Sequence, residues 1–301
     1  MEESVLLCSS FSSDGKYLAC GYSNGFAVYQ CEKVRKLFFR KFITGGIGLI
    51  EMVESSNLFL LVGGGMRPLF SPSQVMIWDD AQARFVGEIT VGSKVLNLRV
   101  TKKLFVVVTI NNVYMYNRDT LKKVSEYSTV ENSLGVIASN SECIVIPGQE
   151  RGSLTVISHE GGIVHLKAHS NYLQSVYLAD RGSLIATASE KGTLIRLFDI
   201  EDGRKCQEFR RGYDKAAISL LCVSQDQKYM MCAIDRTIIS IFEISENSVS
   251  KAFTSLFTTE GKPVVSLSLQ NEIKSIYICN ASSIYVLTVA EVFMQFQLDD
   301  G

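Results

Sequence analysis

The sequence predicts an all-β fold, a seven-bladed β-propeller, from three observations. Short apolar runs rich in Val, Ile, Leu, Tyr and Phe recur along the whole chain, and Gly, Asn, Asp and Ser separate them. No long stretch keeps the spacing of an amphipathic helix. The runs also group into phrases of three, and seven phrases in 301 residues give about 43 residues each, within the usual range of propeller repeats.

A propeller keeps many short strands soluble because each sheet packs face to face on the next and leaves only short edges. A sandwich would need longer connections, which the regular repeat does not favour. Pro is scarce, at 4 residues, and no linker or low-complexity tract interrupts the chain. We therefore expect residues 1–301 to form a single domain.

The first four repeats follow one another directly. Their expected strands are Val5–Phe11, Tyr17–Tyr22 and Gly25–Gln30; Ile47–Val53, Leu58–Gly63 and Val75–Asp79; Val95–Val100, Leu104–Thr109 and Asn112–Asn117; and Leu134–Ala138, Glu142–Ile146 and Ser153–Ser158.

The last three repeats have the same form. Their expected strands are Leu173–Leu178, Leu184–Ala188 and Leu194–Ile200; Ile218–Val223, Tyr229–Ala233 and Thr237–Ile244; and Val264–Leu269, Ser275–Cys279 and Ser283–Val289, with Val292–Leu298 closing the seventh.

Composition narrows the classes of function. A net charge of −1 disfavours a protein that coats nucleic acid through its overall field, so any anion site must be local. No apolar run is long enough to span a bilayer, and Met1-Glu2-Glu3-Ser4 is not a basic signal-peptide start. We expect a cytoplasmic protein with peripheral membrane contact, and reduced thiols, because the 8 cysteines contain no Cys-x-x-Cys pair.

Signals of catalysis are weak. The chain has 3 histidines, and the spacing of His165 and His169 would suit a metal only on a helix, whereas Ile163–Leu166 has strand character. Gly63-Gly64-Gly65 is followed by no Gly-Lys-Ser/Thr, and it is expected to end a strand. We expect no enzyme activity, no metal and no cofactor.

The stretch Phe209-Arg210-Arg211-Gly212 is the candidate anion site. In an extended chain, consecutive side chains point to opposite faces, so Arg210 and Arg211 would serve two different grooves. A guanidinium presents a fork of donors that matches phosphate oxygens. A solvated basic edge that blunts strand pairing is the other interpretation.

Two stretches resemble the PROPPIN family, WD-repeat-like propellers that bind phosphoinositides in autophagy. The first is Phe-Arg-Arg-Gly preceded by Ala186-Thr187-Ala188-Ser189-Glu190-Lys191-Gly192-Thr193-Leu194-Ile195-Arg196. The second combines Gly45–Met52, Leu60–Gly65 and Val75–Asp80. The resemblance implies recognition of phosphatidylinositol 3-phosphate, and also of the 3,5-bisphosphate, by a peripheral protein of autophagosome-precursor, endosomal or vacuolar membranes.

The resemblance implies one headgroup site on each side of the arginine pair. The first would use Arg210 with Ser189, Thr193 and Arg196, with Thr187 and His169 as further candidates. The second would use Arg211 with Arg236 and Thr237. Here the chain reads Ile234-Asp235-Arg236-Thr237 where the family carries Ser-Asp-Lys-Gly-Thr, which puts the second site in doubt.

The family's membrane-inserting loop corresponds to Ser245–Lys262. Phe253, Leu256 and Phe257, together with Val249, fall on one face of a helix and would enter the bilayer. A buried outer strand would use the same residues. We place this segment between the sixth and seventh repeats.

Partner proteins are the remaining question. The loop Met66–Gln74, with Pro68, Phe70 and Pro72, corresponds to the region with which the family holds proteins of the autophagy lipid-transfer or conjugation machinery. A scaffold propeller with weak or lost lipid binding is therefore the alternative function.

Basic residues interleaved with Phe38, Phe39 and Phe42 could stack single-stranded bases, but outer-strand alternation explains them equally well. We expect a monomer that binds no nucleic acid.

Overall fold

The computed structural model describes residues 4–179, 184–224, 226–245, 263–280, 283–288 and 293–297. The chain divides into two compact units, residues 1–127 with 131–135 and residues 128–130 with 136–301. Within the described ranges the regular elements are all strands, so the all-β prediction is confirmed. No helix in this part of the chain is long and apolar enough to cross a bilayer.

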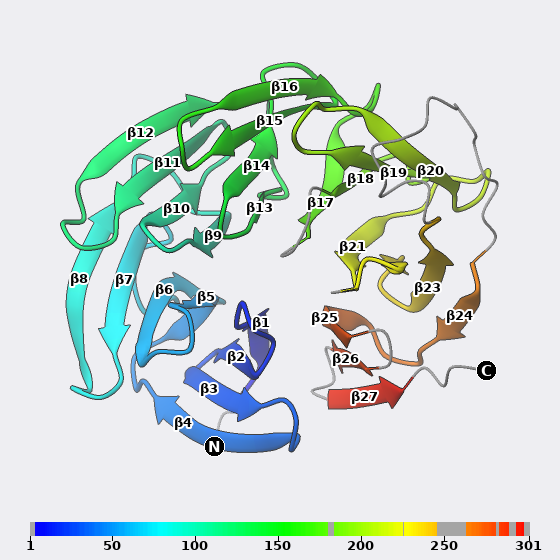
Figure 1. Ribbon diagram of the computed structural model, residues 1–301. Coiled ribbons are helices and arrows are strands. Elements are labelled where there is room, and N and C mark those ends of the chain that lie inside the picture. Colours follow the sequence, from blue (N-terminus) through cyan, green and yellow to red (C-terminus); the bar gives the residue numbers. More distant parts are fainter. Residues whose placement is uncertain are drawn as a thin grey trace. The chain divides into compact units, whose positions relative to one another are not determined.

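The first unit contains three antiparallel four-stranded sheets, each formed by consecutive strands (Figure 1). Their bounds are β1 Leu6–Phe11, β2 Tyr17–Tyr22, β3 Gly25–Gln30 and β4 Arg35–Lys41; β5 Gly46–Met52, β6 Leu58–Gly64, β7 Gln74–Asp79 and β8 Arg84–Thr90; and β9 Asn97–Val100, β10 Leu104–Val108, β11 Asn112–Asn117 and β12 Lys123–Ser128.

The second unit repeats this meander in four sheets. The strands are β13 Ala138–Ser139, β14 Cys143–Pro147, β15 Ser153–Ser158 and β16 Ile163–Lys167; β17 Leu173–Leu178, β18 Leu184–Ser189, β19 Leu194–Asp199 and β20 Lys205–Arg210; β21 Ile218–Val223, β22 Tyr229–Ile234, β23 Ile238–Glu243 and β24 Val265–Ser268; and β25 Ile273–Asn280, β26 Ser283–Thr288 and β27 Phe293–Gln297.

The prediction of seven blades is wrong. Among the described residues six sheets have the four strands of a complete blade, and the last sheet has three. The error lies at Val264–Leu269, which we assigned to the seventh repeat. β24 instead pairs with β23, with Ile239 opposite Leu267, and so completes the sixth sheet. Residues 246–262 accordingly connect two strands of one sheet rather than two sheets.

The apolar cores lie between neighbouring sheets of each unit. In the first unit, Phe26 of the first sheet and Phe59 of the second are fully buried, with ring centroids 5.1 Å apart. In the second unit, Phe209 of the fifth sheet and Phe242 of the sixth are in the same relation, at 5.4 Å. Each buried aromatic side chain contributes about 1.5–3 kcal/mol to folding, so these interfaces hold consecutive sheets together.

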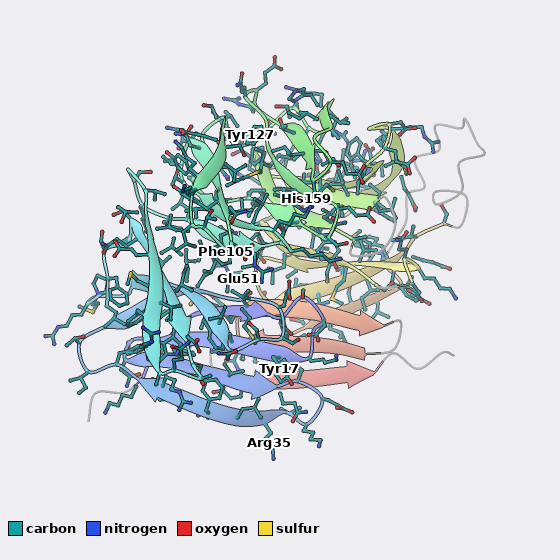
Figure 2. The ribbon with its side chains drawn as sticks, turned by 60° about the vertical axis from the view of Figure 1, so that its left-hand side comes forward. Tyr17, Arg35, Glu51, Phe105, Tyr127 and His159 are labelled. Carbon is teal, nitrogen blue, oxygen red and sulfur yellow. The ribbon has the colours of Figure 1, made fainter. Side chains whose placement is uncertain are left out.

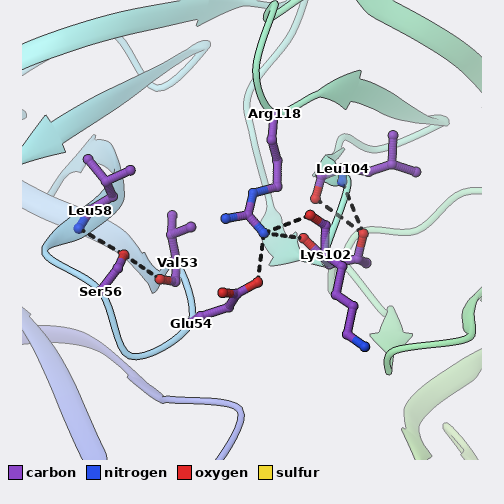
Figure 3. A network of polar contacts seen from close by, with 8 residues as sticks. Val53, Glu54, Ser56, Leu58, Lys102, Leu104 and Arg118 are labelled. Atoms are coloured by element: carbon purple, nitrogen blue, oxygen red, sulfur yellow. Dashed lines mark hydrogen bonds and ion pairs between the residues drawn. The ribbon is translucent and has the colours of Figure 1, made fainter.

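Polar contacts also join neighbouring sheets of the first unit. Figure 3 shows Arg118, after β11, donating from Nη1 to Glu54 Oε1 at 2.8 Å and to the carbonyls of Thr101 and Lys102 at 3.0 and 2.9 Å. Glu54 belongs to the β5–β6 turn of the second sheet. One side chain therefore ties the second sheet to the third.

The fourth strand of each complete sheet lies at its edge and was mostly missing from the expected strands. β4 shows why, because Arg35, Lys36 and Leu37 are all exposed and the strand lacks a clear apolar alternation. Figure 2 shows Arg35 pointing away from the first sheet. Its sequence alone therefore gives little strand signal.

Candidate functional site

The paired arginines lie where β20 ends, in the second unit. Phe209 is fully buried in the core between the fifth and sixth sheets, which fixes the strand up to this point. Arg210 is the last strand residue, opposite Leu194, and Arg211 begins the loop that leads to the sixth sheet. Both arginines are half-buried, and their side chains have different partners.

Arg210 carries the available guanidinium of the pair. Its Cζ lies 5.3 Å from the centroid of the exposed Tyr213 ring. Among the described residues no carboxylate lies within ion-pair distance of it. Its hydrogen-bond donors can therefore be offered to an anion.

Arg211 is used by the protein itself. Its Nε donates to the Gly192 carbonyl at 2.9 Å, its Nη2 donates to the Asp214 carbonyl, and its backbone N–H donates to the Thr193 carbonyl at 2.9 Å. The side chain thus ties the loop after β20 to the β18–β19 turn. In this position Arg211 organises the loop rather than a separate groove.

Gly192 allows the two segments to approach each other. Its φ is +64°, a left-handed conformation, and a Cβ at this position would lie 1.7 Å from the Ala216 carbonyl oxygen. The left-handed conformation favours glycine, and the close contact excludes any side chain. The Gly of the Ser-Glu-Lys-Gly-Thr stretch is therefore required by the loop that carries Arg211.

Four predicted or adjacent residues form one buried polar network. His169 Nε2 lies 3.0 Å from Thr187 Oγ1, and the Thr187 hydroxyl donates to the Arg196 carbonyl at 3.3 Å. Arg196 Nε donates to Glu208 Oε2 at 2.7 Å, and its Nη1 donates to the Ala168 carbonyl at 2.6 Å. The structure therefore brings His169, Thr187 and Arg196 together, but these residues form hydrogen bonds within the protein.

Glu208 was missing from the sequence-based site, although Arg196 and Glu208 are directly opposite each other on β19 and β20. Burial alone would raise the pKa of the Glu208 carboxyl, but the hydrogen bond and charge of Arg196 hold it below its ordinary value. Burial, reinforced by the charge of Arg196, lowers the pKa of His169 to about 4. At neutral pH the histidine supplies no charge, and the charge of Arg196 is balanced by Glu208.

Ser189 and Thr193 flank the β18–β19 turn and are both largely buried. The Gly192 N–H donates to the Ser189 carbonyl at 2.8 Å, which closes the turn. Within the described residues neither hydroxyl is engaged in a hydrogen bond. The turn next to Arg210 thus carries two hydroxyls that can donate to a ligand.

The side of the pair facing the sixth sheet differs in charge. Asp235 and Arg236 both have positive φ, 46° and 61°, in a tight turn closed by the Thr237 N–H and the Ile234 carbonyl. Asp235 accepts the Ala217 N–H at 2.8 Å, and Arg236 Nη1 lies 3.7 Å from Glu272 Oε2. Two carboxylates therefore stand on this side, which disfavours a second anion there.

The loop between β6 and β7 is held on the second sheet. Leu69 N–H donates to the Gly46 carbonyl at 3.0 Å, and Pro68 bridges to the same glycine. Phe70 packs edge-on against Phe85 at 5.0 Å, and the Pro72 carbonyl accepts the Val95 N–H at 2.8 Å. The most exposed apolar side chain of this loop is Met66, which the sequence analysis did not single out.

The aromatic residues of the basic β4 segment do not form a platform for bases. The rings of Phe38, Phe39 and Phe42 lie 6.2 Å from Phe26, 5.7 Å from Tyr22 and 5.5 Å from Trp78, respectively. They pack within the first two sheets, while Arg40 pairs with Asp80 and the other basic side chains of β4 are exposed. This geometry corresponds to outer-strand alternation.

The predicted membrane-inserting residues Phe253, Leu256 and Phe257 lie outside the described residues. Among the residues that are described, no group of three or more His, Cys, Asp or Glu side chains is arranged to hold a metal ion.

Comparison with solved structures defines the class of fold. KlAtg21, in its complex with the coiled coil of AgAtg16, matches with a TM-score of 0.80 at 17% sequence identity, over 99% of this chain and 95% of that one. Together with the four-stranded meanders, this likeness defines a β-propeller. The sequence model of the PROPPIN family matches residues 5–262, and the chain belongs to this family. The predicted resemblance is confirmed.

Curated relatives carry related names. SVP1-like protein 2 of Neurospora crassa is 32% identical over 254 residues, which make up 83% of this chain and 58% of that protein. Autophagy-related protein 18e of Arabidopsis thaliana is 31% identical over 237 residues, 76% of this chain and 63% of that protein. The chain thus spans about three fifths of the length of these relatives.

Proposed function

We propose that this PROPPIN is a peripheral membrane protein of autophagy that recognises phosphatidylinositol 3-phosphate, and also the 3,5-bisphosphate, and recruits autophagy or endosomal partners. It would act in the cytoplasm, on autophagosome-precursor, endosomal or vacuolar membranes, without catalysis. Family membership supports this function, and the geometry around Arg210 supports a headgroup site there.

The observation that carries the proposal is the Arg210 guanidinium beside the β18–β19 turn, which has no carboxylate partner among the described residues. A guanidinium forms two parallel hydrogen bonds with a phosphate, and hydroxyls such as those of Ser189 and Thr193 supply further donors. Arg196 would contribute through its remaining donors, since Glu208 and the Ala168 carbonyl use two of them. The headgroup would therefore bind on the fifth-sheet side of the arginine pair.

One headgroup site is favoured over two. Arg211 already donates to two carbonyls, and Asp235 and Glu272 stand on the other side of the pair. Arg236 and Thr237 would then contribute little to headgroup binding. We expect titration of the soluble headgroup to give a stoichiometry near one.

Single substitutions test the site more sharply than a double one, because the two arginines have different roles. Arg210→Thr should weaken flotation with vesicles containing phosphatidylinositol 3-phosphate by at least about ten-fold, since a charge-assisted hydrogen bond is worth about 1.5–3 kcal/mol. Its melting temperature should stay unchanged. Arg211→Thr should lower the melting temperature because the loop loses its tie to Gly192.

The matched control is Arg84→Thr, which removes another arginine of an outer strand. Arg84 is exposed on β8, and its Nε donates to Gln82 Oε1 at 2.8 Å. This variant should float as the wild type does. Wild-type binding by Arg210→Thr would refute the lipid function at this site and leave the scaffold alternative.

The scaffold alternative rests on the loop between β6 and β7. Its backbone is held by Gly46, while Met66 of the same loop is fully exposed. A rigid loop with an exposed methionine is suited to contact with a protein partner. The complex of KlAtg21 with a coiled coil supports a partner-binding role for this family member as well.

A further inference from the structure

Tyr213 is conspicuous because it is an aromatic residue held outside the core. Its side chain is 80% exposed, whereas the other large exposed hydrophobic side chains of the described chain are aliphatic. It lies three residues beyond Arg210, and the two side chains are in contact. Neither the fold nor the proposed headgroup contacts require an aromatic ring at this position.

The loop that carries Tyr213 is fixed at both ends. Arg211 ties its beginning to the Gly192 carbonyl and to the Asp214 carbonyl beyond the tyrosine. At its end, Ala217 and Asp235 exchange two hydrogen bonds, each of 2.8 Å, in which the Ala217 N–H donates to the Asp235 carboxylate and the Asp235 N–H to the Ala217 carbonyl. Tyr213 therefore projects from a braced loop.

The ring lies over the Arg210 guanidinium, with 5.3 Å between Cζ and the ring centroid. A cation–π contact of this kind attracts the guanidinium to the ring without using an oxygen acceptor, so the N–H groups can still donate to a phosphate. It also limits the rotamers of a long side chain that has no carboxylate partner among the described residues. The cost of ordering that side chain on binding is thereby reduced.

We propose that Tyr213 is a positioning residue for anion recognition: its ring holds the Arg210 fork in the orientation that takes a phosphate monoester. This inference rests on the proposed headgroup function, and it adds a residue that acts through Arg210 without touching the phosphate. The ligand chemistry is that of an inositol phosphate, whether it belongs to a lipid or is free in solution.

The test uses the full chain and two substitutions at one position. Tyr213→Phe keeps a ring over Arg210 and should bind soluble dibutanoyl phosphatidylinositol 3-phosphate as the wild type does. Tyr213→Leu keeps apolar bulk without a ring and should bind it about two- to five-fold more weakly, the range that an exposed cation–π contact supplies. Because the residue is exposed, both variants should have the same melting temperature as the wild type.

A double-substitution cycle separates positioning from any direct effect. In an Arg210→Ala background, Tyr213→Leu should change binding no further, because the ring then has no guanidinium to hold. Repeating the titrations with inorganic phosphate and with vesicles containing the lipid distinguishes a free anion from a membrane headgroup. Equal loss in all arms locates the effect at the phosphate.

The outcomes divide cleanly. If the wild type binds the soluble lipid and Tyr213→Leu binds it equally well, the positioning role is refuted while the headgroup function stands. A further loss on Tyr213→Leu in the Arg210→Ala background also refutes it, since the ring would then act by itself. If the wild type binds neither the soluble lipid nor the vesicles, both the function and this inference fail.

Discussion

His169 lies next to the candidate site and titrates outside the physiological range. It is largely buried, bound to Thr187, and faced by the positive Arg196 and the negative Glu208. Burial and the charge of Arg196 lower its pKa from 6.5 to about 4. The folded protein therefore resists protonation of a group that the unfolded chain protonates readily.

The sign of the resulting pH dependence follows from this difference. As the pH falls from 6.5 to 4, the unfolded chain takes up the proton first, so stability falls in this window and the loss is complete below pH 4. The upper limit of the loss is about 3 kcal/mol. His169→Gln keeps a hydrogen-bonding side chain without the titration. Its melting temperature should fall less than that of the wild type between pH 7 and pH 4, and equal slopes would contradict the prediction.

Residue patterns selected most members of the candidate site, but they did not predict which of its side chains pair with each other. Arg210 was identified from the arginine pair, and His169, Thr187 and Arg196 from the family pattern. Glu208 was missed because an acidic residue in a strand has no local signal for its cross-strand partner. The role of Arg211 in tying the loop after β20 to the β18–β19 turn was missed. Its acceptors are backbone carbonyls, and no residue pattern shows which carbonyls a side chain will reach.

At the scale of elements, the turns that join hairpin strands decide which groups the candidate site can offer to a ligand. The fifth sheet has a turn with a glycine in the left-handed conformation, and the loop after β20 lies directly on it. The sixth sheet has a shorter turn in which Asp235 and Arg236 take that conformation themselves. Without a glycine, the turn of the sixth sheet takes a different backbone path. Its Asp235 carboxylate accepts the hydrogen bond of the Ala217 N–H, at the end of the loop after β20.

Gly192→Ala measures how closely the loop and the turn depend on each other. The new methyl group would meet the Ala216 carbonyl in a left-handed backbone, so the free energy of unfolding should fall by at least about 2 kcal/mol. Gly161→Ala is the control, because Gly161 has a φ of +97° with nothing within 4 Å of the added carbon. In chemical denaturation, the free energy of unfolding should fall less for Gly161→Ala than for Gly192→Ala. Equal decreases would show that the structure accommodates a methyl group next to Ala216.

At the scale of the whole chain, the strands were predicted better than their grouping. The bounds Tyr17–Tyr22, Asn112–Asn117 and Leu173–Leu178 agree with β2, β11 and β17, because each is a short segment rich in apolar and aromatic residues. Val264–Leu269 was correctly expected to be a strand but was given the wrong partner. Pairing across an intervening segment depends on the register with Ile238–Glu243, which no local pattern contains. The count of seven blades failed for this reason.

Arg118 tests how consecutive sheets are held together beyond their apolar cores. Its side chain is 20% exposed and joins Glu54 of the second sheet to two carbonyls of the third. Arg118→Met keeps the length of the side chain but leaves the two carbonyls and the carboxylate without this donor. We expect the free energy of unfolding to fall by about 1–3 kcal/mol.

Two comparison variants separate the contributions to that loss. Glu54→Gln should cost less than about 1 kcal/mol, because the Glu54 side chain is 56% exposed and solvent screens the ion pair. Arg84→Met, at an exposed arginine that has no carboxylate partner among the described residues, should be close to neutral. If Arg118→Met is as mild as Arg84→Met in thermal and chemical denaturation, the apolar core between the second and third sheets holds them without this tie. If Glu54→Gln accounts for the whole loss, the ion pair rather than the carbonyl contacts joins the two sheets.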